Sequence, residues 1–455
     1  MKINPQYFTE HETSCNPRLQ RDITAIIRSA LGSCDPSTII RKHLSRNGKV
    51  IQAFDQKWVI SDNGKVYVCA LGKAAIPMIS STKEILGEEM YAGLAVTKVK
   101  STPERYYKNI RVLKGDHPLP GKHSEAAADE VIEFLHSTSL DDLVIFLVSG
   151  GGSALVSKPA QGITMMEMQQ LTSVLLNASV PIHEINILRK HLDTMKGGGL
   201  LHQALPANTL TLILSDVVGN QLASVASGPT LPDISTYYDC LRIISERSLM
   251  DLIPPGILKY LRDGSAGSHL ETLKPNEYDI SRHKAYLVGS LQMAIKAAAD
   301  SATKMGYSVI TASNYLQKDA EMETNRIMEQ FADMVNGNPP QKTLMIWGGE
   351  VTVQRVGSNW GGRNLHMALL LSEAIAEMDG VSGITFATDG EDGSTDAAGA
   401  FFDSHTHEKA KKAGLLGRTA LESQDSYHYF DTLGDLIVTG STETNVNDMI
   451  MLLKE

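Results

Sequence analysis

Short, continuously apolar runs that end at glycine or a small polar residue constrain this fold more than any other feature. Val66–Leu71 leads into Gly72, Leu143–Val148 leads into Ser149, and a third run covers Leu210–Leu214. An apolar run without alternation is typical of a strand buried on both faces of a parallel sheet. Segments with helical spacing alternate with such runs in both halves of the chain. The sequence therefore predicts an α/β protein with layered, largely parallel sheets.

A local change in amino-acid composition predicts the domain boundary. Residues from about 255 to 283 are rich in proline, glycine, serine and charge, and strand–helix alternation resumes after them. A chain of 455 residues has room for two or three domains. We predict two α/β domains, covering residues 1–265 and 280–455, with a strand over 435–438 and a final helix from about 445.

The charge balance excludes several classes of partner. The 42 basic and 52 acidic side chains leave a net charge of −10, which offers no general attraction to nucleic acid or an anionic membrane. The four cysteines have no metal-ligand spacing, and the N-terminus lacks the apolar segment of a signal peptide. No apolar run approaches the length of a membrane-spanning helix. We expect a cytoplasmic protein that acts on a small molecule. The sequence does not decide between a monomer and a homodimer.

Glycines gather where strands end, which is where ligands bind in open α/β sheets. Glycine there permits positive φ angles and close approach of a ligand to backbone N–H groups. The standard nucleotide fingerprints are absent, however. A P-loop at Lys73 fails because Ala74 follows the lysine, and a GxGxxG motif at Gly150 fails at Leu155. The sequence gives no support for NAD.

Cationic and glycine-rich strand ends predict an anion site. Lys73 follows a buried strand and opens a helix, where its ammonium can lie over an anion. Arg363 follows two glycines, and its guanidinium can bind a carboxylate or a transferring phosphoryl group. Lys196, just before three glycines, can complement the C-terminus of the helix that precedes it. The loop after the second buried run offers backbone N–H groups and two hydroxyls, from Ser149, Gly150, Gly151, Gly152 and Ser153.

Acidic and amide side chains also stand at strand ends. Asp216 and Asp389 each follow a predicted strand, and Glu350 follows two glycines. Such carboxylates can hold Mg²⁺ or accept a hydroxyl proton, although capping of a helix N-terminus explains either aspartate equally well. Asn445 lies in the last strand-end loop, with capping of the predicted final helix as its alternative.

Nine stretches carry a resemblance to a known family. Together they run in the family's order from about residue 20 to the end. They are VCALGKAAIPM, GDHPLPG, FLVSGGGSALVSKP, NILRKHLDTMKGGGL, LILSDVVGNQLASVASGPTLPD, WGGEVTV, NWGGRNLHMALL, FATDGEDGSTDAAGA and LIVTGSTETNVND. The chain resembles the two-part glycerate 2-kinase family, whose C-terminal part is called MOFRL.

The resemblance implies phosphorylation of D-glycerate at O2 by ATP and Mg²⁺, giving 2-phospho-D-glycerate. It also implies a Rossmann-like N-terminal domain, a MOFRL-type C-terminal domain and an active site in the cleft between them. We assign catalysis to Lys73, Arg363 and Asp216 and metal binding to Glu350 and Asp389. ATP binding is assigned to the loop 149–153 together with Lys196 and Asn445.

Departures from the family pattern leave the acceptor open to a related sugar acid. Leu365 and His366 replace the usual Gln-Glu, Gly199 stands where arginine is common, and Asn220 replaces aspartate. Two other functions remain as alternatives. One is a hydroxypyruvate reductase, a name often given to relatives, which the missing GxGxxG motif disfavours. The other is a binding protein that has lost turnover.

Overall fold

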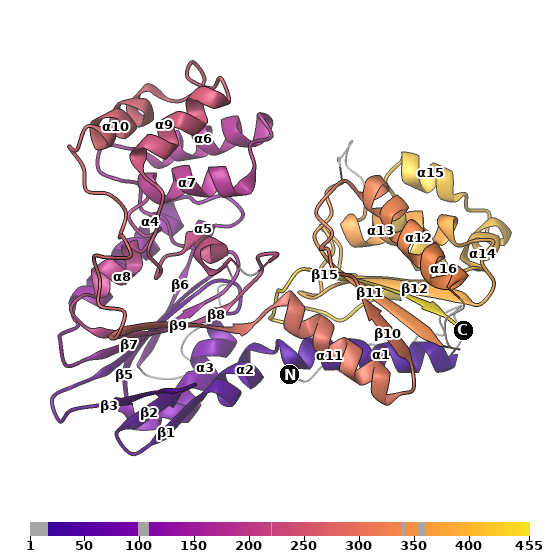
Figure 1. Ribbon diagram of the computed structural model, residues 1–455, viewed down its shortest axis with the longest axis horizontal. Helices are drawn as coiled ribbons and strands as arrows, with labels where there is room; N and C mark the ends of the chain where they lie inside the picture. The colour runs from indigo at the N-terminus through magenta and orange to yellow at the C-terminus, as the bar shows by residue number, and fades with distance from the viewer. Residues whose placement is uncertain (1–16, 99–108, 220, 338–341, 354–359) are drawn as a thin grey trace. The chain divides into compact units, whose positions relative to one another are not determined.

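The computed structural model describes residues 17–98, 109–219, 221–337, 342–353 and 360–455. The chain divides into two compact units (Figure 1). The central unit is Ile39–Val288, and the terminal unit combines the chain up to Thr38 with Gly289–Glu455. Each unit is built on its own six-stranded sheet.

This division differs from the predicted one. Part of the segment 255–283 forms helix α10 (Pro255–Ser265), which buries Ile257 and Leu261 in the central unit. The polar and glycine residues that suggested a linker lie in this amphipathic helix and the loop after it. The N-terminal segment also belongs elsewhere, because helix α1 (Pro17–Ser33) packs against α11 (Leu291–Lys304) in the terminal unit.

The sheet of the central unit has the strand order β6-β5-β4-β7-β8-β9. Neighbours from β6 to β8 pair in parallel. Numbered along the chain, the order is 3-2-1-4-5-6, that of a Rossmann sheet, as predicted. The strands are β4 (Val66–Leu71), β5 (Met90–Thr97), β6 (Ile110–Lys114), β7 (Leu143–Val148), β8 (Asn208–Leu214) and β9 (His283–Gly289).

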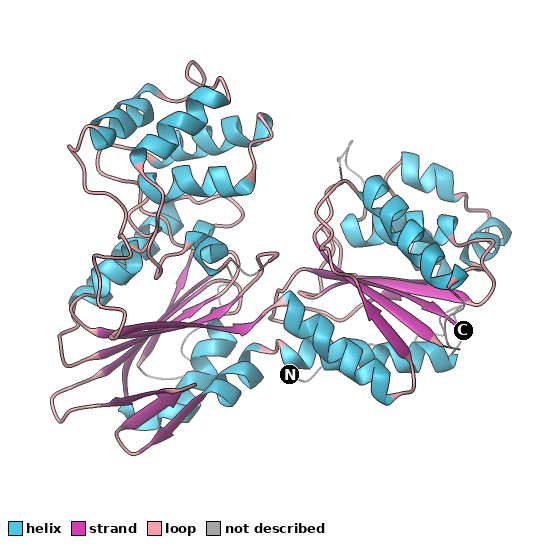
Figure 2. Ribbon diagram, viewed as in Figure 1, coloured by secondary structure: helices cyan, strands magenta, loops and turns pink. Residues whose placement is uncertain are grey.

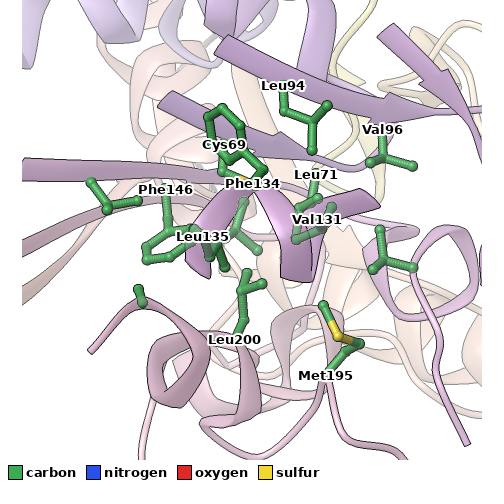
Figure 3. Close-up of a cluster of buried hydrophobic side chains, with 14 of the residues drawn as sticks. Cys69, Leu71, Leu94, Val96, Val131, Phe134, Leu135, Phe146, Met195 and Leu200 are labelled. Carbon is green, nitrogen blue, oxygen red and sulfur yellow. The ribbon is translucent and has the colours of Figure 1, made fainter. Parts of the chain in front are cut away.

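Helices cover both faces of this sheet (Figure 2), which explains why β4 and β7 are apolar at every position. Helix α3 (Ala75–Leu86) contacts β4, β5 and β7. The opposite layer contains α4 (Lys122–His136) and α8 (Gly199–Ala204). Figure 3 shows the resulting core, in which Cys69 and Phe146 from the sheet lie near Phe134, Leu135 and Leu200 from the helices.

A helical layer extends the central unit around a second core of buried apolar residues. Its helix α6 begins with the predicted capping box, since Thr164 Oγ1 accepts from Glu167 N at 3.2 Å. The layer comprises α6 (Met165–Asn177), α7 (Ile182–Leu192), α9 (Tyr237–Glu246) and α10. The unit's remaining elements are α2 (Pro36–His43), whose first residues precede the unit boundary, β1 (Leu44–Asn47), β2 (Val50–Ala53), β3 (Gln56–Val59), η2 (Gly87–Glu89), α5 (Gly152–Leu155) and η4 (Leu222–Ser227).

The sheet of the terminal unit is mostly antiparallel, so the prediction of a largely parallel sheet is wrong for this half. Its order is β10-β11-β15-β12-β13-β14, and only β10 and β11 pair in parallel. Burial on both faces produces the same apolar runs in either arrangement. The strands are β10 (Ser308–Thr311), β11 (Thr343–Gly349), β12 (Val381–Ala387), β13 (Gly399–Asp403), β14 (Leu436–Ile437) and β15 (Asp448–Lys454).

The predicted final helix is instead the strand β15. It lies between β11 and β12 and is buried from Asp448 to Leu453. A short apolar run of this kind fits a buried strand and a buried helix equally well by periodicity. Figure 2 shows α1 and α11 on one face of this sheet and the remaining helices on the other. Those helices are α12 (Ala320–Asn336), α13 (Arg363–Ala374), α14 (Thr406–Lys412), α15 (Gly417–Glu422) and α16 (Ser426–Leu433).

The packing of α1 on α11 predicts a local effect of Ile26→Ala. Ile26 is 1% exposed, and removing its buried methyl groups costs about 2–5 kcal/mol. We expect faster amide hydrogen exchange in α11 and unchanged exchange in β4. Ile145→Ala, in the core of the central unit, is the matched control and should give the reverse pattern. Faster exchange in β4 alone for Ile26→Ala would contradict the assignment of α1 to the terminal unit.

Candidate active site

In the central unit, two loops meet where the strand order reverses between β4 and β7. This reversal is the usual ligand position in a doubly wound sheet. Lys73 N donates to Gly150 O at 2.9 Å, and Ala74 N donates to Ser149 Oγ at 3.1 Å. Ser149 Oγ in turn donates to Leu71 O at 3.2 Å. These hydrogen bonds hold the two predicted anion-binding loops against each other.

Glycine is required at two positions of these loops. Gly72 has φ +118°, and a Cβ there would lie 2.2 Å from Ser149 Oγ. Gly151 has φ +82°, and its Cβ would lie 3.3 Å from both Lys73 Cγ and the His117 ring. The left-handed conformation and the close approach both exclude larger residues.

Lys73, His117 and Asp216 surround the glycine loop. A Cβ on Gly150 would lie 2.1 Å from Asp216 Oδ2, so this carboxylate packs directly on the loop. Partial burial lowers the pKa of His117, and the charges of Lys73 and Lys98 lower it further. His117 therefore favours its neutral form, and Lys73 is close enough to repel the protonated form of the His117 ring.

The glycine loop presents unused backbone donors. The N–H groups of Gly150 and Gly151 donate to no acceptor within the described part of the chain. Two successive backbone N–H groups of this kind can bind carboxylate or phosphate oxygens, and the side chain of Lys73 packs against this loop. Ser153 differs, because its hydroxyl bonds Ser227 Oγ at 3.0 Å.

Lys196 is buried and paired, with 4% of its side chain exposed. It donates to Asp193, which is fully buried, and burial lowers the pKa of Lys196 against the attraction of Asp193. Lys196 also lines a small, mainly apolar cavity with Gly152 and Ala226. Its ammonium is thus held by a carboxylate rather than by the end of a helix.

In the terminal unit, the other predicted residues gather at one edge of the sheet. Strand β15 runs antiparallel to both β11 and β12, so the carboxyl ends of these two strands flank its first residue. Gly349 and Ala387 both pair with Asp448. Glu350 and Asp389 follow the ends of β11 and β12, and Asn445 precedes β15.

Arg363 is held by two carboxylates at this edge. Its Nε and Nη2 donate to the two carboxylate oxygens of Asp448 at 2.5 and 3.3 Å, and its Nη1 donates to Glu350 Oε1 at 2.5 Å. Burial raises the pKa of Asp448 to about 7, while Arg363 acts to lower it. Burial lowers the pKa of Arg363, but Asp448 and Glu350 together raise it beyond its ordinary value.

Asp392 fixes the start of α13, which carries Arg363. It is buried and accepts from Asn364 N at 3.0 Å and Leu365 N at 2.8 Å. A Cβ on Gly362 would lie 2.2 Å from Asp392 Oδ1, which explains the glycine before Arg363. Asp392 thus positions Arg363 through the backbone of α13.

The predicted metal ligands do not form a metal site as arranged here. Glu350 Oε1 accepts from Arg363 and Oε2 accepts from Asn447 Nδ2 at 2.9 Å, so a metal role for Glu350 would need one of these donors to move. Asp389 Oδ1 accepts from Glu391 N at 3.2 Å. The described residues include no group of three His, Cys, Asp or Glu side chains able to hold a metal ion.

Sequence reasoning missed three residues at this edge. Asp448 and Asp392 contact Arg363 or its helix, and Asn447 contacts Glu350. The buried Asn447 Oδ1 has no hydrogen-bond partner among the described residues. Asn447 and Asp448 were missed because a helix was predicted from about residue 445, where the structure has a turn and then β15. Asn445 caps no helix: its Oδ1 accepts from Asn447 N at 3.1 Å in that turn.

Comparisons with known proteins identify the family. Residues 22–262 match a family model described as a domain of unknown function (DUF4147), and residues 343–448 match the MOFRL family. Glycerate 2-kinase of Pyrococcus horikoshii is 35% identical over 86% of this chain and 87% of its own length. The chain belongs to the glycerate kinase family.

The crystal structure of a Thermotoga maritima glycerate kinase has the same fold as this family member. It superposes with a TM-score of 0.82 at 30% identity, covering 97% of this chain and all of that one. A relative from Agrobacterium vitis, 32% identical over 98% of this chain and 96% of its own, carries the name hydroxypyruvate reductase. Within the described residues, no helix is both long and apolar enough to span a membrane.

Two of the sequence departures have structural explanations in this glycerate kinase family member. Leu365 is fully buried in the core of the terminal unit. At Gly199 a Cβ would lie 2.0 Å from Thr194 O, so no larger residue fits this backbone. The other two departures are His366 and Asn220. Burial lowers the pKa of His366. Asn220 lies outside the described residues.

The proximity of Lys73 to His117 predicts a shift that NMR can measure. Lys73→Met removes a positive charge and keeps most of the apolar stem, so the pKa of His117 should rise toward the ordinary histidine value. Titration of histidine ring protons gives the pKa, with His117→Gln identifying the signal. Lys49→Met, at an exposed lysine paired with Asp62, is the control and should leave the signal unchanged. An unshifted His117 in Lys73→Met would contradict this geometry.

Proposed function

We propose that this protein transfers the γ-phosphoryl group of ATP to the 2-hydroxyl of D-glycerate, giving 2-phospho-D-glycerate. The observation that carries the proposal is the position of Lys73 beside the Gly150 and Gly151 N–H groups at the reversal of a Rossmann sheet. Membership of the glycerate kinase family supplies the substrate class. Related small sugar acids are the alternative acceptors.

Phosphoryl transfer depends mainly on positioning and on neutralising charge. Lys73 and the glycine N–H groups are proposed to bind phosphate oxygens, and Ser149 keeps the two loops together. Arg363, oriented by Asp448 and Glu350, is proposed to bind the transferring group or the acceptor carboxylate. Residues of both units would then serve one reaction.

The 2-hydroxyl must lose a proton as the new phosphate ester forms. Asp216 is the candidate base, because its carboxylate lies against Gly150, next to Lys73. We propose that Mg²⁺ enters as part of the nucleotide substrate, bound mainly by its phosphates, as is common for this ion. Asp389 remains the proposed protein ligand, and Glu350 is proposed to orient Arg363.

A reductase is the second candidate. The Rossmann strand order and the name of the Agrobacterium vitis relative favour it. The loop after β4, however, reads Gly72-Lys73-Ala74 where a dinucleotide site has its glycine fingerprint. Oxidation of NADH by hydroxypyruvate, followed at 340 nm, would reveal this activity. A reductase without ATP-dependent phosphorylation would overturn the kinase proposal.

Lys73→Ala tests the kinase proposal directly. Electrostatic stabilisers of a transferring group are worth roughly 100-fold or more in kcat, so we expect a loss of that size. ³¹P NMR should identify 2-phosphoglycerate as the wild-type product from ATP and D-glycerate. Lys57→Ala, at an exposed lysine of β3, is the matched control. Near-normal turnover by Lys73→Ala would refute the role of Lys73.

The double variant Lys73→Ala/Arg363→Ala tests whether the two units act together. Residues that serve one transition state show strongly non-additive losses. We expect the double variant to lose much less than the product of the two single losses. Fully multiplicative losses would show that Lys73 and Arg363 act independently.

A further inference from the structure

The helix α7 carries a cluster of charged side chains outside the strand-end site. Three cations lie at or just beyond the end of this helix: Arg189, Lys190 and Lys196. Lys190 Nζ lies 3.1 Å from Asp233 Oδ1, and Lys196 donates to Asp193. These ion pairs are buried, so each lysine is neutralised by its own carboxylate. Arg189 is the third cation of this cluster. The two buried carboxylates, Asp193 and Asp233, are already paired with the two lysines.

Asp193 cannot accept hydrogen bonds from Arg189 as arranged here. Its Oδ2 accepts from Ser157 Oγ at 2.5 Å and from Lys196, and its Oδ1 accepts from Met195 N at 2.9 Å and Lys158 N at 3.2 Å. Arg189 donates to no acceptor within the described residues, although it is half-buried. Burial lowers the pKa of its guanidinium, and Asp193 only partly offsets this.

A second group on the same helix face also lacks an acceptor. Asn186 lies one turn before Arg189, so their side chains are neighbours on α7. Asn186 is 8% exposed, and its Oδ1 accepts from Ser227 Oγ at 3.1 Å. Its amide Nδ2 donates to nothing in the described part of the chain. A half-buried guanidinium and a buried amide thus offer adjacent donors that no described residue uses.

A strained loop connects this helix face to the glycine loop. Ala226 and Ser227 have φ +50° and +61°, a left-handed conformation that is unfavourable for residues other than glycine. Gly197 N donates to Ser227 O at 3.1 Å and helps to hold that conformation. The Ser227 hydroxyl then bridges Asn186 and Ser153, and Ser153 closes the 149–153 loop.

We propose that Arg189, assisted by Asn186, is a second anion-binding site of the central unit and binds a substrate oxyanion next to the glycine loop. The ligand chemistry is a carboxylate or phosphate group, either the carboxylate of the hydroxy acid or a phosphate of the nucleotide. An arginine fork that has no acceptor among the described residues suits either one, because it can donate two parallel hydrogen bonds. The assignment to a particular substrate rests on the proposed kinase function.

The test is steady-state kinetics of full-length Arg189→Gln with D-glycerate and ATP varied separately. Hydrogen bonds to charged groups are worth roughly 10-fold or more in affinity, so the KM of one substrate should rise by at least that factor. A rise for D-glycerate alone identifies the carboxylate, and a rise for ATP alone identifies a phosphate. Unchanged KM values for both overturn the proposal.

Two further variants separate anion binding from folding. Arg189→Lys keeps the charge and loses the fork, so it should recover part of the lost affinity and serves as the test if Arg189→Gln does not fold. An equal loss of affinity in Arg242→Gln, at an exposed arginine of α9 paired with Glu246, would overturn a specific role.

A binding measurement distinguishes failure of this proposal from failure of the kinase function. Thermal-shift titrations with D-glycerate and with inorganic pyrophosphate do not depend on turnover. If the wild type binds either anion but lacks kinase activity, a weaker shift in Arg189→Gln still supports the anion site. Equal shifts in the wild type and Arg189→Gln overturn the site whatever the reaction.

Discussion

Parallel pairing of β4 with β7 is the constraint on which the arrangement of the glycine loop and Lys73 in the central unit depends. Both strands are fully buried, so their backbone groups must bond to neighbouring strands, and their ends must leave the sheet side by side. Ser149 extends this pairing beyond the sheet through its bonds with Leu71 and Ala74. Lys73 and Gly150, far apart in the chain, become neighbours as a direct consequence.

The terminal unit also brings polar residues from distant parts of the chain together at one sheet edge, but it does so with a mostly antiparallel sheet. The last strand, β15, inserts antiparallel between β11 and β12 and brings Asp448 to the edge where both strands end. Arg363 needs this arrangement, because its fork is oriented by Asp448 and its third donor by Glu350. The side chain of Arg363 is partly exposed, and its ion pairs with these two carboxylates fix the orientation of the guanidinium.

Local pairing, and not overall composition, decides where anions can bind. The chain carries a net charge of −10, yet Lys73 lies beside unused glycine N–H groups. Lys196 looks similar in the sequence, but it forms an ion pair with the buried Asp193. A basic residue near glycines therefore does not by itself predict an anion site.

Local patterns were enough to predict much of this protein. The buried runs that became β4 and β7, the capping box at Thr164 and the strand-end positions of Lys73, Glu350 and Asp389 all follow from short-range rules on burial, capping and glycine conformation. The tertiary structure alone decided the antiparallel insertion of β15, the packing of α1 on α11 and the partners of Arg363 and Lys196. Strand direction, unit membership and charge pairing depend on contacts between distant residues, and the periodicity of a single segment carries no information about them.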